Sequence, residues 1–345
     1  MNIVFKGNKN MTTNKSSMVL ITGATGLLGA HLLRTLLAEG YTNLRALRRT
    51  TSDMTQVATI ADQIEWIEGD ILDIFSLENA LENVEKVYHC AAMISYQPRD
   101  GAKMLKVNVE GTANVVNSAL EKGVKRLIYV SSIAAIGENK KESATKLIHE
   151  KTPWERSPNN SDYAISKYLA EQEVWRGAAE GLAVAVVNPS IILGYGDWRE
   201  SSTTLFRQVW KGLNYYPIGT TGYVDVKDVA RFMVLLMEST IQEERYILNG
   251  ENLRFQDFFN QVADALGKKR PSHAVAPWLA GLAWRVEWLR SKMTGKAPIL
   301  TKSSAHTSSQ IRCYDNTKSL KAFPDFHYTP IEKTIKEVGE RFLSK

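Results

Sequence analysis

The feature that most constrains the fold is a glycine-rich turn between a short apolar strand pattern and an apolar helical pattern. In the stretch VLITGATGLLGAHLLRTLLAEG (19–40), Gly23, Gly26 and Gly29 follow a run of branched apolar residues. Three glycines so close together are entropically unfavourable, so another group must approach this backbone or impose its dihedral angles. Such turns bind a pyrophosphate with backbone N–H groups and the positive end of the next helix. A dinucleotide site is predicted here, with a mere packing turn as the alternative.

The apolar runs predict the rest of the fold. Strand-like runs occupy residues 18–23, 43–49, 64–70, 86–92, 124–132 and 183–194, and helical patterns, such as 27–39 and 105–123, lie between them. Alternating strands and helices favour βαβ units and a parallel sheet covered on both faces. The predicted fold class is α/β, a Rossmann-type doubly wound parallel sheet with a smaller C-terminal substrate lobe.

The chain divides into three predicted parts. The polar, basic start lacks the apolar core of a signal peptide, so residues 1–17 are interpreted as a flexible arm. Residues 18–190 form the predicted cofactor-binding domain, to which residues at about 220–250 return. Residues 191–345 form mainly the substrate lobe, because the strand–helix rhythm loosens after about residue 190.

Composition excludes several classes of protein. With 345 residues, of which 44% are hydrophobic and 23% charged, the chain has an ordinary globular composition. The net charge of +6 is dispersed along the chain, which argues against a nucleic-acid partner and suits an anionic cofactor or membrane surface. Cys90 and Cys313 form neither a disulfide framework nor a metal motif. We therefore expect no metal and a reducing compartment, the cytoplasm.

The end of the second strand carries the signal for cofactor choice. An acidic residue that would bind the ribose 2′-hydroxyl is expected there, but the sequence has Arg48 and Arg49. A guanidinium donates hydrogen bonds and suits a 2′-phosphate. Arg48, and less strongly Arg49, predicts NADP(H) over NAD, with solvated arginines as the alternative.

A Tyr-x-x-x-Lys pair points to acid–base chemistry. Tyr163 and Lys167 in YAISK lie on one face of a predicted helix, where a cation lowers the high pKa of a phenol. Tyr223 and Lys227 have the same spacing but alternate like a strand, which would separate them by about 13 Å. Only the first pair is therefore predicted to act together.

Two serines supply a candidate hydroxyl for the substrate. Ser131 and Ser132 end the fifth strand-like run, and ligands of parallel α/β sheets bind at the carboxyl ends of the strands. Small residues that simply end a strand are the alternative. Their position at the strand end does not show which of the two serines would contact the substrate.

These motifs together resemble the extended short-chain dehydrogenases/reductases. The matching stretches, in chain order, are TGATGLLG, GDILD, YHCAA, NVEGT, YVSS, YAISK, NPS and YVDVKDVA, within residues 18 to about 250. The resemblance is closest to the dihydroflavonol-reductase-like and 3β-hydroxysteroid-dehydrogenase-like branch. The C-terminal third matches only loosely.

The resemblance implies roles for individual residues. The catalytic set is Ser132, selected because it lies five residues before Gly137, with Tyr163, Lys167 and the supporting Asn108. The implied cofactor-binding residues, besides Tyr163 and Lys167, are Gly23, Thr25, Gly26, Leu27, Leu28, Arg48, Asp70, Ile71, Cys90, Ala91, Ala92, Asn188, Pro189 and Ser190.

The resemblance implies an NADP(H)-dependent oxidoreductase that interconverts a carbonyl and a secondary alcohol on a small, largely apolar substrate. A nucleotide-sugar epimerase or dehydratase on the same scaffold is the alternative. Such enzymes usually have an arginine for the substrate diphosphate just before the YVDVKDVA stretch, and this chain has GTTG there. A third possibility is a non-catalytic NADP sensor, against which the intact Ser, Tyr and Lys argue. Substrate identity and oligomeric state stay open, with a homodimer as one possibility.

The segment 277–295 contains three tryptophans: Trp278 and Trp284 lie near one helical stripe, and Trp288 widens its apolar face. It is too short to span a bilayer, which needs about 20 apolar residues. Either the rings pack the lobe onto the sheet, or the segment forms a lid or a peripheral membrane contact with its basic residues toward anionic lipid.

Overall fold

The computed structural model describes residues 15–95, 97–138, 147–198, 202–275, 284, 285, 287, 290 and 302–344. Most of the predicted N-terminal arm, residues 1–14, lies outside the described residues.

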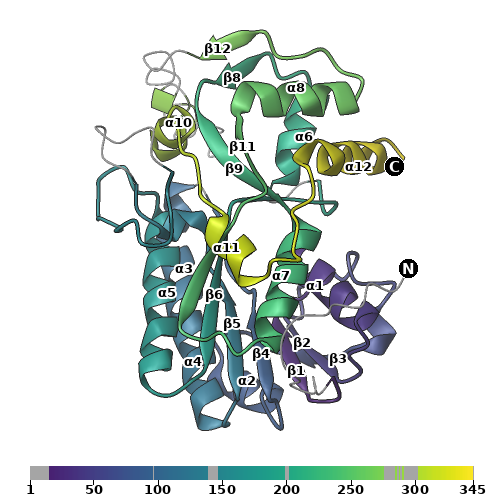
Figure 1. Cartoon of the computed structure of the whole chain (residues 1–345), viewed down its shortest axis with the longest axis vertical. Helices are drawn as coiled ribbons and strands as arrows, with labels where there is room; N and C mark the ends of the chain where they lie inside the picture. Colours follow the sequence, from purple (N-terminus) through teal and green to yellow (C-terminus); the bar gives the residue numbers. More distant parts are fainter. Residues whose placement is uncertain are drawn as a thin grey trace.

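A seven-stranded parallel sheet forms the centre of the larger body (Figure 1). Its strands are β1 (Val19–Thr22), β2 (Leu44–Arg48), β3 (Glu65–Glu68), β4 (Lys86–His89), β5 (Arg126–Val130), β6 (Val184–Pro189) and β10 (Glu244–Leu248). They are arranged in the order β10-β6-β5-β4-β1-β2-β3, and every neighbouring pair is parallel. The order reverses between β1 and β4, which is where such sheets open a ligand crevice at the carboxyl ends of the strands.

Helices cover both faces of this sheet. One face packs on α1 (Leu27–Ala38) and α7 (Val226–Glu238), and the other on α2 (Ile74–Ala80), α4 (Gly111–Glu121) and α5 (Asp162–Ala179). Neighbouring residues of β1 show the alternation, since Leu20 and Ile21 are both fully buried but belong to cores on opposite faces. A strand buried on both faces is expected to be largely apolar, as Val19, Leu20 and Ile21 are.

Shorter helical segments complete the larger body. They are the α-helices α3 (Gly101–Leu105) and α11 (Thr317–Ala322), a π-helical turn over Lys106–Glu110, and 3₁₀ turns at Ala61–Gln63, Pro98–Asp100 and Ile133–Ala135.

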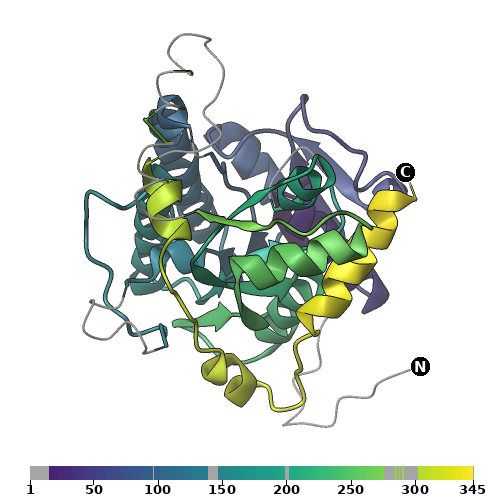
Figure 2. The same cartoon turned by 90° about the horizontal axis from the view of Figure 1, so that it is seen from above.

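A second, smaller body lies above the carboxyl ends of the strands (Figure 1). It contains a three-stranded sheet of β7 (Ile191–Leu193), β9 (Thr220–Asp225) and β11 (Glu251–Arg254), and the pair β8 (Tyr215–Pro217) and β12 (His273–Val275). Its helices are α6 (Thr203–Trp210), α8 (Phe255–Ala265), α10 (Lys302–Ser308) and α12 (Ile331–Leu343). Helices α8 and α12 lie side by side in Figure 2 and share a core with Phe206 and Tyr223.

The predicted fold class is confirmed. The described segments between Trp198 and Pro217, and from Asn252 to Val275, add no strand to the main sheet, whereas β10 does. Helix α7 returns to the larger body and packs against α1.

Candidate functional site

The glycine turn has a different physical reason at each glycine. Gly23 has φ +69°, and a Cβ there would lie 2.6 Å from the backbone nitrogen of Ala91. A Cβ on Gly29 would lie 2.2 Å from the carbonyl oxygen of Gly23. Gly26 is exposed, and the nearest atom to a Cβ there is 3.4 Å away. The first and third glycines therefore let the turn pack on β4 and on itself, and the second leaves open space above the turn.

Helix α1 begins at this turn with free donors. Its N-cap is Gly26, which has no side-chain cap, and the first turn carries no acidic residue. By contrast, Asp73, Ser161 and Asp225 cap α2, α5 and α7 with their side chains. The first N–H groups of a helix lack partners within the helix, so the start of α1 suits a bound anion.

The residues that flank the turn are packed in place. The side chain of Leu27 would lie 3.5 Å from a Cβ on Gly194 and 3.0 Å from one on Gly196. Leu28 is buried, and Thr25 is half-buried. Across the turn, Cys90 donates its backbone N–H to Thr22, and Ala92 is exposed.

Arg48 and Arg49 lie at the end of β2, where the sequence predicts a 2′-phosphate. The Arg48 guanidinium is 3.9 Å from the Glu68 carboxylate, with side chains 31% and 56% exposed. An ion pair this exposed contributes little stability, about 0–1 kcal/mol, so Arg48 can exchange Glu68 for another anion. The Arg49 side chain is exposed, and its backbone N–H donates to Ser52.

Asp70 and Ile71 lie after β3 at the same edge of the sheet. The Asp70 carboxylate accepts from the Leu72 N–H at 2.9 Å, and the Ile71 carbonyl accepts from Asn114 at 3.1 Å. Ile71 also contacts Gly111 at the start of α4. These contacts hold the Asp70–Ile71 backbone at the place predicted to flank an adenine.

Tyr163 and Lys167 lie one turn apart on α5, as predicted. Tyr163 is half-buried, whereas Lys167 is 1% exposed. The Lys167 ammonium donates to the Tyr129 hydroxyl at 2.8 Å and to the Val130 carbonyl at 2.7 Å. Burial lowers the pKa of Lys167 to about 7, and the nearby Glu171 opposes that fall. An ammonium has three donors, so one remains for another acceptor.

A buried polar chain connects Lys167 to the glycine turn, and the sequence analysis did not find it. Thr112 is hydrogen-bonded to Tyr129, and its hydroxyl is 3.0 Å from His89, whose other ring nitrogen is 2.7 Å from the Thr22 hydroxyl. Burial lowers the pKa of His89 to about 3, so its ring is neutral at pH 7. This series of hydrogen bonds fixes the positions of β1, β4 and β5 relative to one another at the crevice.

Asn108 connects α5 to the loop after β4. Its amide donates to Ser166 at 2.9 Å and to the Met93 carbonyl at 3.0 Å, and its oxygen accepts from the Met93 N–H. Asn108 is 1% exposed. These contacts are those expected of a residue that supports the helix bearing Tyr163 and Lys167.

The two serines after β5 have different environments. The Ser132 oxygen accepts from the Ala134 N–H at 3.1 Å, which leaves its hydroxyl hydrogen free to donate, and the side chain is half-buried. Ser131 is 4% exposed, and its hydroxyl has no hydrogen-bond partner among the described residues. Ser132 stays the predicted catalytic hydroxyl.

Asn188, Pro189 and Ser190 end β6 beside these serines, and all three are buried. Asn188 donates to the Ser132 carbonyl at 3.0 Å and to the Glu171 carboxylate at 2.9 Å. The Asn188 amide oxygen and the Ser190 hydroxyl are buried without a partner among the described residues. Buried polar atoms are normally satisfied, so this crevice suits a polar ligand.

The second Tyr-x-x-x-Lys pair is separated, but not for the predicted reason. Tyr223 lies in β9 and is fully buried, with its ring stacked on Phe258. The strand ends at Asp225, so Lys227 lies on α7, where it pairs with Glu337 at 2.7 Å. The expectation of one continuous strand through Lys227 is wrong because Asp225 caps a helix there.

The tryptophan segment 277–295 lies mostly outside the described residues, including Trp278 and Trp288. Of those described, Trp284 is half-buried, and the Arg285 guanidinium lies 4.7 Å from its ring centroid. Arg290 pairs with Glu287 at 2.7 Å.

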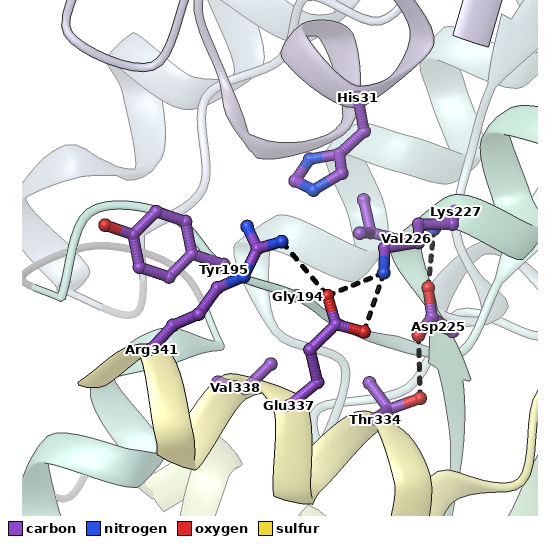
Figure 3. A pocket seen from close by; sticks show the side chains of 10 residues that line it. All are labelled: His31, Gly194, Tyr195, Asp225, Val226, Lys227, Thr334, Glu337, Val338 and Arg341. Carbon is purple, nitrogen blue, oxygen red and sulfur yellow. Dashed lines mark hydrogen bonds and ion pairs between the residues drawn. The ribbon is translucent and has the colours of Figure 1, made fainter. Parts of the chain in front are cut away.

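A small cavity between α1, α7 and α12 lies apart from the predicted site residues (Figure 3). Lys227 pairs there with Glu337, which also pairs with Arg341. Burial lowers the pKa of the adjacent His31 to about 4, so its ring is neutral at pH 7. The ion pairs at this cavity connect α12 to the start of α7.

No helix in the described part of the chain is both long and apolar enough to cross a membrane. No group of three or more His, Cys, Asp or Glu side chains within it could hold a metal ion.

Comparisons with known proteins show the family of this chain. A model of the "NAD dependent epimerase/dehydratase family" matches residues 19–249. Sterol demethylase protein B of Methylococcus capsulatus is 34% identical over 264 residues, which cover 75% of this chain and 78% of that protein. A putative dihydroflavonol 4-reductase of Synechocystis is 30% identical and covers 87% of this chain and 88% of its own length.

Among solved structures, that of gox2253 has a TM-score of 0.82 and 31% identity, and covers 95% of this chain and 98% of its own. The chain therefore belongs to the NAD-dependent epimerase/dehydratase family of extended short-chain dehydrogenases/reductases, and it is an NAD(P)-dependent enzyme of the reductase/dehydrogenase type.

Proposed function

We propose that the protein uses NADP(H) to interconvert a carbonyl and a secondary alcohol on a small, largely apolar substrate. The observation that carries the proposal is the placement of Tyr163, Lys167 and Ser132 at the carboxyl ends of β5 and β6. When bound, the cofactor supplies or accepts the hydride.

In the reductive direction, the Tyr163 hydroxyl donates a proton to the substrate oxygen as negative charge develops on it. The Lys167 ammonium stabilises the phenolate that remains and has one donor free for a ribose hydroxyl. The free hydrogen of Ser132 donates to the same substrate oxygen. Asn108 supports this helix through Ser166.

The residues at the crevice fit a dinucleotide. The turn from Gly23 to Leu28 and the uncapped start of α1 suit the pyrophosphate, and Asp70–Ile71 and Cys90–Ala92 flank the crevice. The unpartnered polar atoms of Asn188 and Ser190 suit the nicotinamide end, beside Pro189.

The structure around the GTTG stretch supports a substrate without a diphosphate. A Cβ on Gly219 would lie 2.4 Å from two backbone carbonyl oxygens, and one on Gly222 would lie 2.1 Å from the Asn249 amide oxygen. Neither position has room for an arginine side chain. Two relatives are named for a sterol and a dihydroflavonol, which are polycyclic, phosphate-free molecules.

A turnover screen tests the substrate class. We expect NADPH oxidation with polycyclic or aryl ketones and none with UDP- or GDP-sugars, because the tightly packed Gly219 and Gly222 offer no cation for a diphosphate. NADPH absorbance, and product analysis for epimerised or dehydrated sugars, measure the two activities. Conversion of a sugar nucleotide without conversion of any ketone would establish the epimerase or dehydratase alternative.

The relative affinities for NADPH and NADH test the proposed role of Arg48 in binding the 2′-phosphate. We expect tighter binding of NADPH than NADH, and Arg48→Asp should narrow or reverse the difference, because a carboxylate repels the 2′-phosphate and accepts from the 2′-hydroxyl. Fluorescence titration measures both dissociation constants. Glu68→Gln is the matched control, since it frees Arg48 from its carboxylate neighbour and should favour NADPH further. Equal wild-type affinities would contradict the assignment.

The segment 277–295 is proposed as a peripheral membrane contact, supported by Trp284 beneath the exposed Arg285. Co-sedimentation with anionic vesicles tests it, and recovery in the supernatant alone would contradict it.

The proposed assembly is a homodimer, and the proposed location is the reducing cytoplasm. Sedimentation in solution measures the assembly, and fractionation of cells measures the location.

A further inference from the structure

We propose that Glu171 is a positioning residue of the site, whose buried carboxylate fixes the orientation of Asn188 and holds a negative charge beside Lys167. The inference rests on the proposed function and adds a residue that the motifs do not include. Glu171 lies on α5 one turn beyond Lys167 and is 1% exposed.

Three side chains donate to the Glu171 carboxylate from different elements. Arg245 of β10 donates at 2.9 Å, Asn188 of β6 at 2.9 Å, and Trp175 of α5 at 3.3 Å. Arg245 also donates to the Glu150 carbonyl at 2.9 Å, so both ends of its guanidinium are held. Glu171 thereby joins α5 to the two strands at the edge of the main sheet.

The Glu171 carboxylate helps to determine which atom of the Asn188 amide, the nitrogen or the oxygen, faces it. An ionised carboxylate only accepts hydrogen bonds, so the amide nitrogen must face Glu171. The same nitrogen donates to the Ser132 carbonyl, which positions the backbone of the predicted catalytic serine. The Asn188 oxygen is buried and has no hydrogen-bond partner among the described residues. A neutral residue in place of Glu171 would leave the Ser132 carbonyl as the acceptor that holds this nitrogen, so the amide would lose one of its two anchors.

The charge of Glu171 acts on Lys167 as well. On its own helix, the Lys167 ammonium has Tyr163 one turn before it and Glu171 one turn after it. From other elements, Cys90 and His89 at the end of β4 and Tyr129 on β5 lie near it. Burial keeps the pKa of Cys90 high, at about 12, so its thiol is neutral at pH 7, as is the His89 ring. Among these groups, Glu171 carries the one carboxyl group, and its charge opposes the effect of burial on the pKa of Lys167.

Three variants test the inference. Glu171→Gln removes the charge and keeps the shape, Glu171→Asp keeps the charge but withdraws it from Asn188, and Glu173→Gln removes a surface charge from the same helix. The ¹³Cε resonance of Lys167, assigned with Lys167→Met, reports its titration without any need for turnover. Steady-state kinetics with NADPH and a ketone give kcat and KM across the pH range.

In Glu171→Gln we expect the Lys167 titration and the alkaline limb of kcat to move about one pH unit lower, because an anion is lost beside a cation. We also expect kcat to fall about a hundredfold with KM little changed, since the Ser132 backbone is misplaced. Glu171→Asp should lower kcat without moving the limb, and Glu173→Gln should resemble the wild type. A purely structural role would lower the melting temperature and leave the limb in place.

Unchanged titration and kcat in folded Glu171→Gln would overturn the inference. If that variant does not fold, wild-type kcat in folded Glu171→Asp would do so. Failure of the proposed function is distinct, because then Tyr163→Phe would keep its turnover whatever Glu171 does.

Discussion

Tyr163→Phe is expected to lower kcat by about 10²–10⁴-fold, because the substitution removes the proton donor and leaves the ring in place. Affinity for NADPH should be nearly unchanged, since Lys167 keeps its bonds to Tyr129 and Val130. Single-turnover kinetics and fluorescence titration measure chemistry and binding separately. A fall in kcat without a fall in affinity is the signature of a group that acts on the reacting oxygen.

The matched control is Tyr223→Phe, which removes a hydroxyl from the other Tyr-x-x-x-Lys pair. The Tyr223 hydroxyl is buried without a partner among the described residues, and its ring stacks on Phe258. Its loss should leave kcat at the wild-type value. Loss of turnover in Tyr223→Phe together with normal turnover in Tyr163→Phe would contradict the assignment and place the chemistry at Tyr223 and Lys227.

Gly23→Ala is expected to weaken NADPH binding by at least about tenfold and to destabilise the fold by about 2–5 kcal/mol. A Cβ at this position would lie 2.6 Å from the Ala91 nitrogen and 2.8 Å from the Cys90 carbonyl carbon. These are backbone atoms that cannot move aside as a side chain does, and φ is +69°. The turn must therefore leave β4, which displaces the start of α1. Denaturant titration and cofactor fluorescence measure the two effects.

Gly40→Ala separates steric contact from backbone strain. Gly40 has φ +85° at the other end of α1, but nothing lies within 4 Å of a Cβ there. We expect a loss of about 1–2 kcal/mol from strain and normal NADPH binding. Equal losses of affinity in both variants would show that the close approach of Ala91 is not what shapes the site.

The sequence by itself determined that strands and helices alternate along the larger body and where the glycine turn lies. Because β1 is buried on both sides, its run VLIT has no polar face, and the glycines that follow it mark the turn. Helical spacing likewise placed Tyr163 and Lys167 one turn apart. Local periodicity was enough for these predictions because each depends on residues within a few positions of one another.

Local periodicity was not enough where a helix cap competes with a strand pattern. The alternation in YVDVK continues through Lys227, but the Asp225 side chain accepts from the Lys227 N–H and starts α7. The pattern also left open whether the glycines of the turn approach a phosphate or pack against the protein, and the structure shows that a Cβ on Gly23 or Gly29 would meet backbone atoms of Ala91 or of Gly23.

Only the tertiary structure decided which distant side chains meet. Glu171 and Arg245 are 74 positions apart, and Thr22 and His89 are 67 apart; each pair is brought together where separate elements pack. The apolar pattern shows which face of a strand or helix is buried but not which polar group lies opposite it. That pairing follows from strand order and register, which long-range packing sets, and it is why the sequence determined the Tyr163–Lys167 pair while the structure alone revealed the buried groups around Lys167.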